Sequence, residues 1–234
     1  MNFNPKGYLL VVCFICLCCL IRIGKASEQI SLNENEINIK SILEDKSRAY
    51  TSQEVIKVDE GKLNQRLHDC LIIGDSLVEG LYAYQVLDED QCVGIRGART
   101  DLMDAAFKQV QDKQPQIIFL NYGMNDLEFV GGDAQKFIQT YKDKIHVLKK
   151  LVPQAQLYVN TILPMSEQTR QKKPVYQNYK QFNEAIQTMC LDEHIGFIDQ
   201  STLVQKITYG KDGIHPTKSY YGLWAELMAR EAGR

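Results

Sequence analysis

One serine, about a third of the way along this sequence, lies where its hydroxyl could act as a nucleophile. Ser76 follows the apolar residues 71–73, with Gly74 and Asp75 forming a turn before what reads as a helix. A serine between a buried strand and a helix start is well placed for chemistry, because the free N–H groups of the helix start favour negative charge beside its hydroxyl. For Ser76 taken alone, an ordinary helix N-cap is the alternative, since serine is a preferred cap residue.

Near the other end of the chain, residues 212–215 (DGIH) could supply a base and the acid that orients it. Imidazole is the side chain whose unperturbed pKa lies near neutrality, so His215 can take the proton from Ser76. Asp212 lies three residues earlier, where one turn of chain can place its carboxylate against the imidazole and fix the tautomer. These residue types predict acyl transfer through a serine nucleophile.

The tetrahedral intermediate of acyl transfer carries an oxyanion that needs hydrogen-bond donors. We expect these donors to be the backbone N–H groups of Ser76 and Gly97 and the side-chain amide of Asn125. Glycine suits the second position because the substrate must approach the backbone closely. Gly94 is a neighbouring alternative to Gly97.

Five short apolar runs, rich in β-branched and aromatic residues, alternate with helical patterns along the chain. The runs cover residues 70–73, 92–95, 116–122, 156–163 and 195–198, and the main helical patterns cover about 100–114, 134–151, 174–189 and 217–228. This alternation predicts a parallel sheet covered by helices on both faces. Ligands bind beyond the carboxyl ends of such strands, which is where the loops with Ser76, Gly97 and Asn125 are expected to meet.

Four of these loop sequences resemble blocks I, II, III and V of the SGNH or GDSL hydrolases. The matching segments are GDSL at 74–77, Gly97 in the second block, GMND at 123–126 and DGIH at 212–215. The similarity covers roughly residues 69–231, and four blocks in the right order make it specific. The resemblance implies a flavodoxin-like three-layer α/β/α sandwich with a five-stranded parallel sheet, and ester hydrolysis through an acyl-serine intermediate without a metal or organic cofactor.

Carried over residue by residue, the resemblance implies that Ser76 is the nucleophile and that Asp212 and His215 complete the triad. It also implies that Ser76, Gly97 and Asn125 form the oxyanion hole. None of these five positions departs from the family pattern.

Several neighbouring residues receive roles from the same resemblance. Gly97 is preferred to Gly94 because its spacing to Thr100 resembles the family pattern. Asp75 and Asp126 look like hydrogen-bond acceptors that fix the loops, since buried carboxylates are paired. The residues expected to line an acyl pocket are Leu77, Met124, Leu127 and Ile214, and for the last three the protein core is the alternative.

The first 26 residues differ in kind from the rest. Lys6 precedes an uninterrupted apolar run over residues 8–21, and Gly24 and Ala26 are spaced like a cleavage site. The run spans about 21 Å as a helix, short of the roughly 30 Å hydrocarbon layer. We expect residues 1–26 to be a signal peptide, or else a short N-terminal membrane anchor.

This N-terminal segment sets the expected organisation and location of the whole chain. Residues 27–66 are polar and are expected to form a tether, followed by the hydrolase domain at 67–234. The domain is then expected to be extracytoplasmic, either secreted or tethered to the cell membrane. The membrane is expected to be a partner only through the N-terminal segment.

Composition narrows the classes of partner and cofactor. A formal net charge of −2 with short, mixed charge runs gives no basic face for nucleic acid. Outside the apolar run only Cys70, Cys92 and Cys190 remain, an odd number without close spacing, which favours neither a disulfide framework nor a zinc site. We therefore expect buried thiols and no zinc site, and the resemblance implies that there is no other metal and no cofactor.

The sequence thus predicts an exported serine esterase that acts on a small ester or an acylated glycan. No insertion supplies a lid, which favours short acyl groups such as O-acetyl esters on extracellular or bacterial envelope glycans. A lysophospholipase, a thioesterase or an acyltransferase would leave the same residues. From another class, a catalytically silent envelope binding protein is the alternative, although such a protein has no need for Ser76, Asp212 and His215 together.

Overall fold

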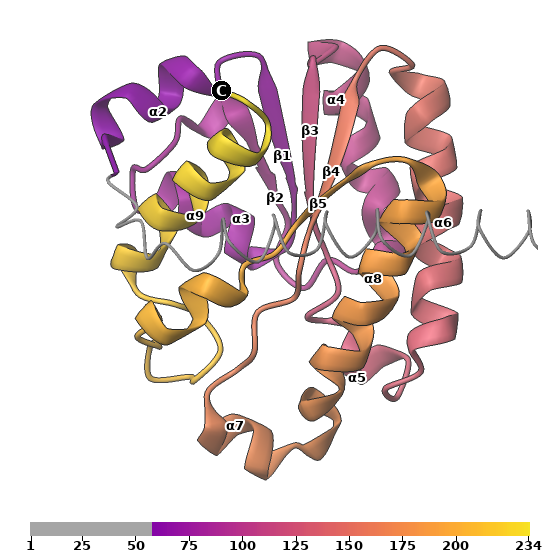
Figure 1. Cartoon of the computed structure of the whole chain (residues 1–234), viewed down its shortest axis with the longest axis vertical. Coiled ribbons are helices and arrows are strands. Elements are labelled where there is room, and N and C mark those ends of the chain that lie inside the picture. Colours follow the sequence, from indigo (N-terminus) through magenta and orange to yellow (C-terminus); the bar gives the residue numbers. More distant parts are fainter. Residues whose placement is uncertain (1–57) are drawn as a thin grey trace, which may run out of the picture. The chain divides into compact units, whose positions relative to one another are not determined.

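A five-stranded parallel sheet forms the centre of the computed structural model, which describes residues 58–234 (Figure 1). Its strands are β1 (Cys70–Gly74), β2 (Cys92–Gly94), β3 (Ile117–Asn121), β4 (Gln156–Asn160) and β5 (Gly196–Ile198). They lie in the order β2-β1-β3-β4-β5, and every pair is parallel. The predicted α/β fold with a five-stranded parallel sheet is confirmed.

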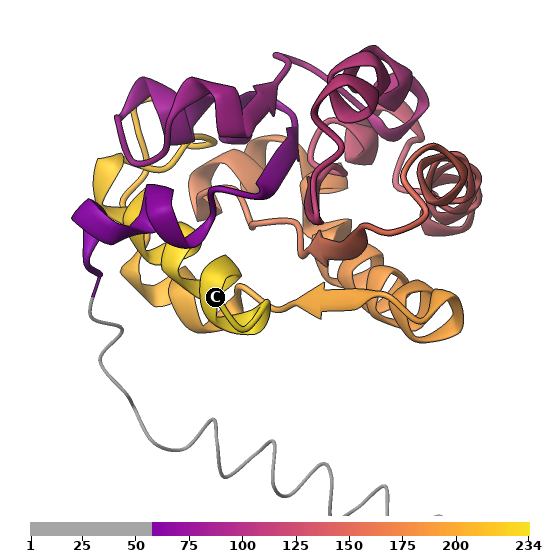
Figure 2. The same ribbon diagram turned by 90° about the horizontal axis from the view of Figure 1, so that it is seen from above.

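Helices cover both faces of this sheet. One face carries α2 (Glu60–Arg66), α3 (Ser76–Ala83) and α9 (Lys218–Glu231), and the other carries α4 (Phe107–Lys113), α6 (Ala134–Leu151) and α8 (Tyr179–Glu193) (Figures 1 and 2). Two short helices, α5 (Asp126–Phe129) and α7 (Glu167–Lys172), follow β3 and β4. Short 3₁₀ helices are η1 (Glu89–Gln91), η2 (Thr100–Ala106), η3 (Pro174–Asn178) and η4 (Ser201–Lys206). The three predicted layers are therefore present.

The strand that leads to Ser76 lies inside the sheet and is supported on both sides. All five residues of β1 are buried, as are all five of β3. Strand β1 pairs on both sides, with Ile73 opposite Val93 in β2 and Leu120 in β3. Strands buried on both faces read as continuous apolar runs, which is why the sequence predicts them well. The backbone in front of Ser76 is consequently fixed from two directions.

The domain begins earlier in the chain than residue 67. Helix α2 occupies residues expected to belong to the tether, and its Leu63 and the adjacent Leu67 are fully buried. Arg66 extends the contact by pairing with Glu226 of α9 at 2.5 Å. Because these side chains complete the layer that contains α9, residues 60–66 belong to the folded domain and not to the tether.

The predicted helix from Thr100 is divided between η2 and α4. Thr100 does not cap it; its N–H and hydroxyl both donate to the carboxylate of Asp126, in the loop after β3. The predicted helix from Pro174 likewise begins with η3, and α8 starts at Tyr179. Both differences occur where the chain leaves the carboxyl edge of the sheet, so loop contacts override helical periodicity there.

Two predictions on the N-terminal part concern residues outside the described range. These are the signal peptide or anchor at 1–26 and the tether up to residue 57. Within residues 58–234, no helix combines the length and the apolar character needed to cross a bilayer.

Candidate active site

Ser76 is held at the first turn of α3 by the residues that precede it. Asp75, not Ser76, is the N-cap, and its carboxylate accepts the N–H of Leu77 at 2.9 Å. Gly74 lies so close to β3 that a side chain there would collide with the backbone oxygen of Asn121. The N-cap interpretation of Ser76 is therefore wrong, and its half-buried hydroxyl has a different partner.

That partner is His215, which lies 139 residues further along the chain. Ser76 Oγ is 2.8 Å from His215 Nε2, and His215 Nδ1 is 2.6 Å from Asp212 Oδ2. Because a carboxylate only accepts hydrogen bonds, Nδ1 carries the proton and donates it, which leaves Nε2 free to accept from the serine hydroxyl. The three side chains form one continuous hydrogen-bonded chain.

The loop around Asp212 fixes its carboxylate. The second oxygen, Oδ1, accepts the N–H groups of Ile214 at 2.9 Å and His215 at 3.0 Å. Burial acts to raise the pKa of Asp212, but the hydrogen bonds from Ile214 and His215 outweigh it and hold that pKa below its usual value. Asp212 therefore stays an anion that can orient the imidazole.

The segment after β4 supports this loop from outside. The N–H of Ser166 donates to the Gly213 carbonyl at 2.8 Å, and the Thr169 hydroxyl lies 3.5 Å from the Asp212 carbonyl. The hydroxyls of Ser166 and Thr169 also fill the space that a side chain on Gly213 would need. Neither residue belongs to the four loop sequences that predict the site. Ser166 is the N-cap of α7, a role its residue type suggests, but nothing in the sequence indicates its contact with Gly213.

The two glycines after β2 have different surroundings. Gly94 packs against α3, where an added side chain would meet the backbone of Glu79. Gly97 is exposed, has a φ of +72°, and an added side chain there would meet nothing within 4 Å. Among the described residues no hydrogen bond uses the N–H of Ser76 or Gly97. Gly97 is therefore the glycine that leaves room for a ligand at its backbone.

Asn125 joins the loops that follow β2 and β3. Its half-buried side-chain amide donates to the Ala98 carbonyl at 3.0 Å and lies 3.5 Å from Asp75 Oδ2. The first bond fixes the orientation of the amide, while the longer contact leaves its second hydrogen weakly held. That hydrogen remains available to another acceptor.

Beneath these groups lie two buried carboxyl groups. Burial raises the pKa of Asp75 to about 7, although the N–H of Leu77 acts in the opposite direction. Burial also raises the pKa of Asp126, against the hydrogen bonds from Thr100. Asp75 lies 3.5 Å from the Asn121 amide, and Asp126 accepts both donors of Thr100. Their predicted role as acceptors that fix the loops is confirmed.

The residues expected to line an acyl pocket lie mostly in the core. Leu77 and Met124 are only 3% and 7% exposed, and Leu127 is fully buried. Leu77 lies in the first turn of α3, which packs on β1 and β2, whereas Met124 lies just before α5 and Leu127 in its first turn, and α5 packs on η3. Ile214, which packs at the edge of the core, is half-buried. Leu77 and Met124 therefore offer little surface to a ligand.

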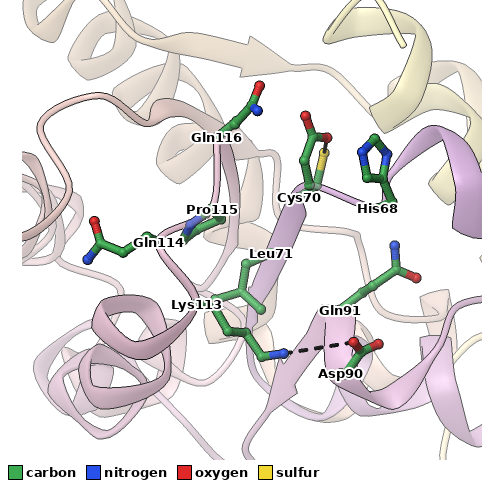
Figure 3. Close-up of a pocket in the computed structure, with 10 residues that line it drawn as sticks. His68, Cys70, Leu71, Asp90, Gln91, Lys113, Gln114, Pro115 and Gln116 are labelled. Atoms are coloured by element: carbon green, nitrogen blue, oxygen red, sulfur yellow. Dashed lines mark hydrogen bonds and ion pairs between the residues drawn. The ribbon is translucent and has the colours of Figure 1, made fainter.

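Other chemistry-bearing groups lie apart from this site. Cys70, Cys92 and Cys190 are buried free thiols, as predicted, and burial raises the pKa of each to about 12. Within residues 58–234 no group of His, Cys, Asp and Glu side chains is arranged to hold a metal ion. A polar cavity of about 250 Å³ lies at the amino ends of β1 and β3, lined by His68 and Lys113 among others (Figure 3). It is at the opposite edge of the sheet from Ser76.

Comparisons with known proteins agree with this geometry. A model of the GDSL-like lipase/acylhydrolase family matches residues 72–223, and no curated protein sequence matches the chain. Similar solved structures include an acylhydrolase-like protein from Bacteroides fragilis (TM-score 0.55, 16% identity, covering 78% of this chain and 100% of that one). An acetyl-xylooligosaccharide esterase from Geobacillus has a TM-score of 0.54 at 17% identity, covering 70% and 94%.

A third similar structure is a carbohydrate esterase family 3 protein from Talaromyces cellulolyticus, with a TM-score of 0.55 at 15% identity, covering 70% of this chain and 95% of that one. At these identities the solved structures show that the fold is shared. The family model covers more than half of the chain and includes all four loop sequences. The chain therefore belongs to the GDSL-like lipase/acylhydrolase family and is an ester hydrolase.

Proposed function

We propose that Ser76 is the nucleophile of this ester hydrolase, His215 its general base and Asp212 the residue that orients His215. The observation that carries the proposal is the unbroken hydrogen-bonded chain from Ser76 Oγ through the imidazole to Asp212, with distances of 2.8 Å and 2.6 Å. Nucleophile, base and orienting acid within hydrogen-bond reach are what acyl transfer through a serine requires.

The reaction proceeds in two halves. Ser76 Oγ attacks the ester carbonyl carbon while its proton passes to His215 Nε2, and the C–O bond to the alcohol breaks as the proton moves to the departing oxygen. A water molecule then attacks the acyl-serine, giving its proton to His215, and the carboxylic acid leaves as Ser76 regains its hydrogen. In both halves the oxyanion is bound by the N–H groups of Ser76 and Gly97 and by the Asn125 amide.

The proposed substrates are short-chain esters, with O-acetyl groups on extracellular or envelope glycans as the main class. Two observations support short acyl groups: Leu77 and Met124 are buried, and Gly97 is open to solvent. The alcohol half is inferred from an analogy, since one of the similar solved structures is an acetyl-xylooligosaccharide esterase. The extracytoplasmic location rests on the apolar run at residues 8–21.

Hydrolysis of a p-nitrophenyl ester series, from acetate to palmitate, tests the proposal when the protein is compared with its Ser76→Ala variant. We expect turnover to depend on Ser76 and to fall as the acyl chain lengthens. A preference for long chains would indicate a lipid substrate such as a lysophospholipid. Turnover that survives in Ser76→Ala would place the nucleophile elsewhere, and a folded protein with no turnover would indicate a binding protein.

The location is tested separately by fractionating cells that produce the full chain and by determining the N-terminus of the recovered protein. A mature protein beginning at Ser27 outside the cytoplasm is expected if the signal peptide is cleaved. A full-length protein in the membrane fraction would indicate the anchor. Recovery in the cytoplasm would contradict export.

A further inference from the structure

A second cavity, of about 410 Å³, opens at the carboxyl ends of β4 and β5. Its wall is formed by the chain that follows β4, including Ile162 and Pro164, and by Phe197 and Val204. On the side of α8 it is lined by Tyr179 and by polar side chains. The volume lies within the range of small-molecule sites, and none of the proposed catalytic steps uses this cavity.

The cavity lies directly behind the loop that carries His215. The Pro164 carbonyl accepts a hydrogen bond from the hydroxyl of Tyr209, and Tyr209 pairs with Pro216, next to His215. Two residues after Pro164, the N–H of Ser166 donates to Gly213. A single stretch of chain therefore separates the cavity from the catalytic loop.

The distance to the nucleophile follows from the order of the strands. Ser76 follows β1, and the cavity begins after β4, two strands further along the sheet. Neighbouring strands lie about 4.8 Å apart, so the cavity begins about 10 Å from the site in this direction. A chain of sugars attached to the alcohol oxygen can cover that distance, whereas a single sugar cannot.

The lining combines apolar surface with polar groups, some of which form no hydrogen bond in the described residues. The guanidinium of Arg170 lies 5.7 Å from the ring of Tyr179, so that ring is already contacted on one side. Tyr179 forms no hydrogen bond through its hydroxyl, and the side chains of Lys180, Glu184 and Gln187 on α8 form none either. The last three are exposed, so they are free to turn toward a ligand. Aromatic rings bind apolar faces, and free donors and acceptors suit hydroxyl groups.

The same lining argues against an acyl chain as the group that the cavity binds. A long acyl chain would cover these polar groups without offering them hydrogen bonds, which is unfavourable for every group that stays unpaired. Lys180 and Glu184 carry opposite charges, and the carboxylate of Asp199 already accepts two hydrogen bonds from Ser201. The charged groups of the lining are mixed in sign, which does not favour a strongly charged ligand.

We propose that this cavity is a subsite for a neutral carbohydrate, where it binds sugars of a glycan chain whose ester is cleaved at Ser76. The inference rests on the proposed function, because it assigns the alcohol half of the same substrate. It predicts that longer acetylated oligosaccharides bind better than short ones, and that the cavity contributes nothing to the hydrolysis of an ester that lacks a sugar chain.

Filling the cavity tests this assignment. Val204→Trp places a large side chain in the half-buried lining, and Leu191→Trp makes the same kind of change on α8 at a side chain that is 71% exposed and outside the cavity. For each variant, kcat and KM are measured with p-nitrophenyl acetate, with p-nitrophenyl palmitate, and with acetylated xylo-oligosaccharides of two and of five sugars. We expect Val204→Trp to raise KM for the longer oligosaccharide about tenfold, the equivalent of about 1.4 kcal/mol, and to leave p-nitrophenyl acetate unchanged.

The control variant Leu191→Trp should change neither substrate. A second test avoids any effect of packing, because Lys180 and Gln187 are both exposed. The double variant Lys180→Ala/Gln187→Ala should also raise KM for the longer oligosaccharide while kcat for p-nitrophenyl acetate stays constant. Agreement of the two tests would support the subsite.

Three outcomes would overturn the subsite. Unchanged KM for the longer oligosaccharide in both cavity variants would do so, as would an equal loss on both substrates in the double variant. A selective loss on p-nitrophenyl palmitate would assign the cavity to the acyl chain instead. These results require a wild-type protein with Ser76-dependent turnover of p-nitrophenyl acetate; if that turnover is missing, the proposed function fails and the subsite fails with it.

Discussion

At the scale of single residues, the hydrogen bond between Ser76 and His215 is the contact on which turnover should depend. Triad members act as a unit, so Ser76→Ala and His215→Ala should each remove most turnover while the protein stays folded. Steady-state kinetics and circular dichroism check this expectation. Ser219→Ala is a matched control, because Ser219 is exposed at the start of α9 and outside the triad. Activity retained in His215→Ala would assign the base to another group.

The Asn125 amide should be needed for the transition state more than for substrate binding. Asn125→Ala is expected to lower kcat by about 10²–10³-fold with little change in KM, the usual effect of losing one oxyanion donor. Kinetics with p-nitrophenyl acetate separate the two constants. Because Asn125 also bonds to Ala98, thermal unfolding of the variant should be measured in parallel. A wild-type kcat would show that another group binds the oxyanion.

Asp75 should make the stability of the protein depend on pH. Its pKa is raised from 3.8 to about 7, first by burial and also by the charge of Asp126, so between these values the folded protein keeps a proton that the unfolded chain releases. This carboxyl therefore adds to the free energy of unfolding below pH 3.8, where it is protonated in both states. The contribution is lost as the pH rises through about 7. Asp75→Asn cannot ionise and should lose this dependence.

Urea unfolding of wild type and Asp75→Asn at about pH 5 and about pH 8 measures the effect. Relative to wild type, the variant should be more stable at the higher pH than at the lower one. Asparagine can still accept the N–H of Leu77, so the helix cap is kept. The same stability difference at both pH values would show that the buried carboxyl does not change its protonation in this range.

The residues of the site differ in how far the sequence predicts them. Asp212 and His215 are three positions apart, so their contact is local and the sequence indicates it directly. The contacts of Ser166 and Thr169 with the catalytic loop join segments more than forty residues apart, and no residue type reveals them. Leu77 is buried, and its place in the motif does not indicate this, because position in a motif does not show which way a helix turns its side chains.

At the scale of elements, the packing of β2 against α3 positions the loop that contains Gly97. Gly94→Ala would place a methyl group against the backbone of Glu79, which cannot move without displacing α3. We expect a loss of roughly 1–3 kcal/mol in the free energy of unfolding, as for overpacked cores. Gly97→Ala has open space and only the strain of its positive φ, and should lose about 1 kcal/mol. Urea unfolding compares the two, and a larger loss in Gly97→Ala would contradict this packing.

The sequence predicts those helices and strands whose own apolar pattern shows how they pack in the core. The strands follow from apolar runs buried on both faces. Helix α2 was missed because Leu63 and Leu67 are isolated in a polar stretch, so it is stabilised by packing and not by its own periodicity. The division of the helix after Thr100 is also not evident from the sequence. It depends on a contact with a distant residue, the carboxylate of Asp126.

At the scale of the whole domain, its first and last helices are joined by charged groups. Arg66 of α2 contacts Glu226 of α9 at 2.5 Å and also donates to the Arg234 carbonyl, while Arg234 pairs with Asp69 at 2.7 Å. The Glu226 side chain is only 8% exposed. These contacts connect the chain before β1, the strand that leads to Ser76, with the helix that follows His215.

Removing the arginine should therefore cost more than removing a surface ion pair. Arg66→Ala leaves the carboxylate of Glu226 buried without its partner, and we expect the free energy of unfolding to fall by about 3 kcal/mol. Lys108→Ala is the control, since the pair of Lys108 and Asp112 is exposed and should contribute less than about 1 kcal/mol. Urea unfolding measures both variants. Equal losses would mean that the Arg66 pair behaves as a surface contact, and the double variant Arg66→Met/Glu226→Leu should recover most of the loss if the unpaired charge is its cause.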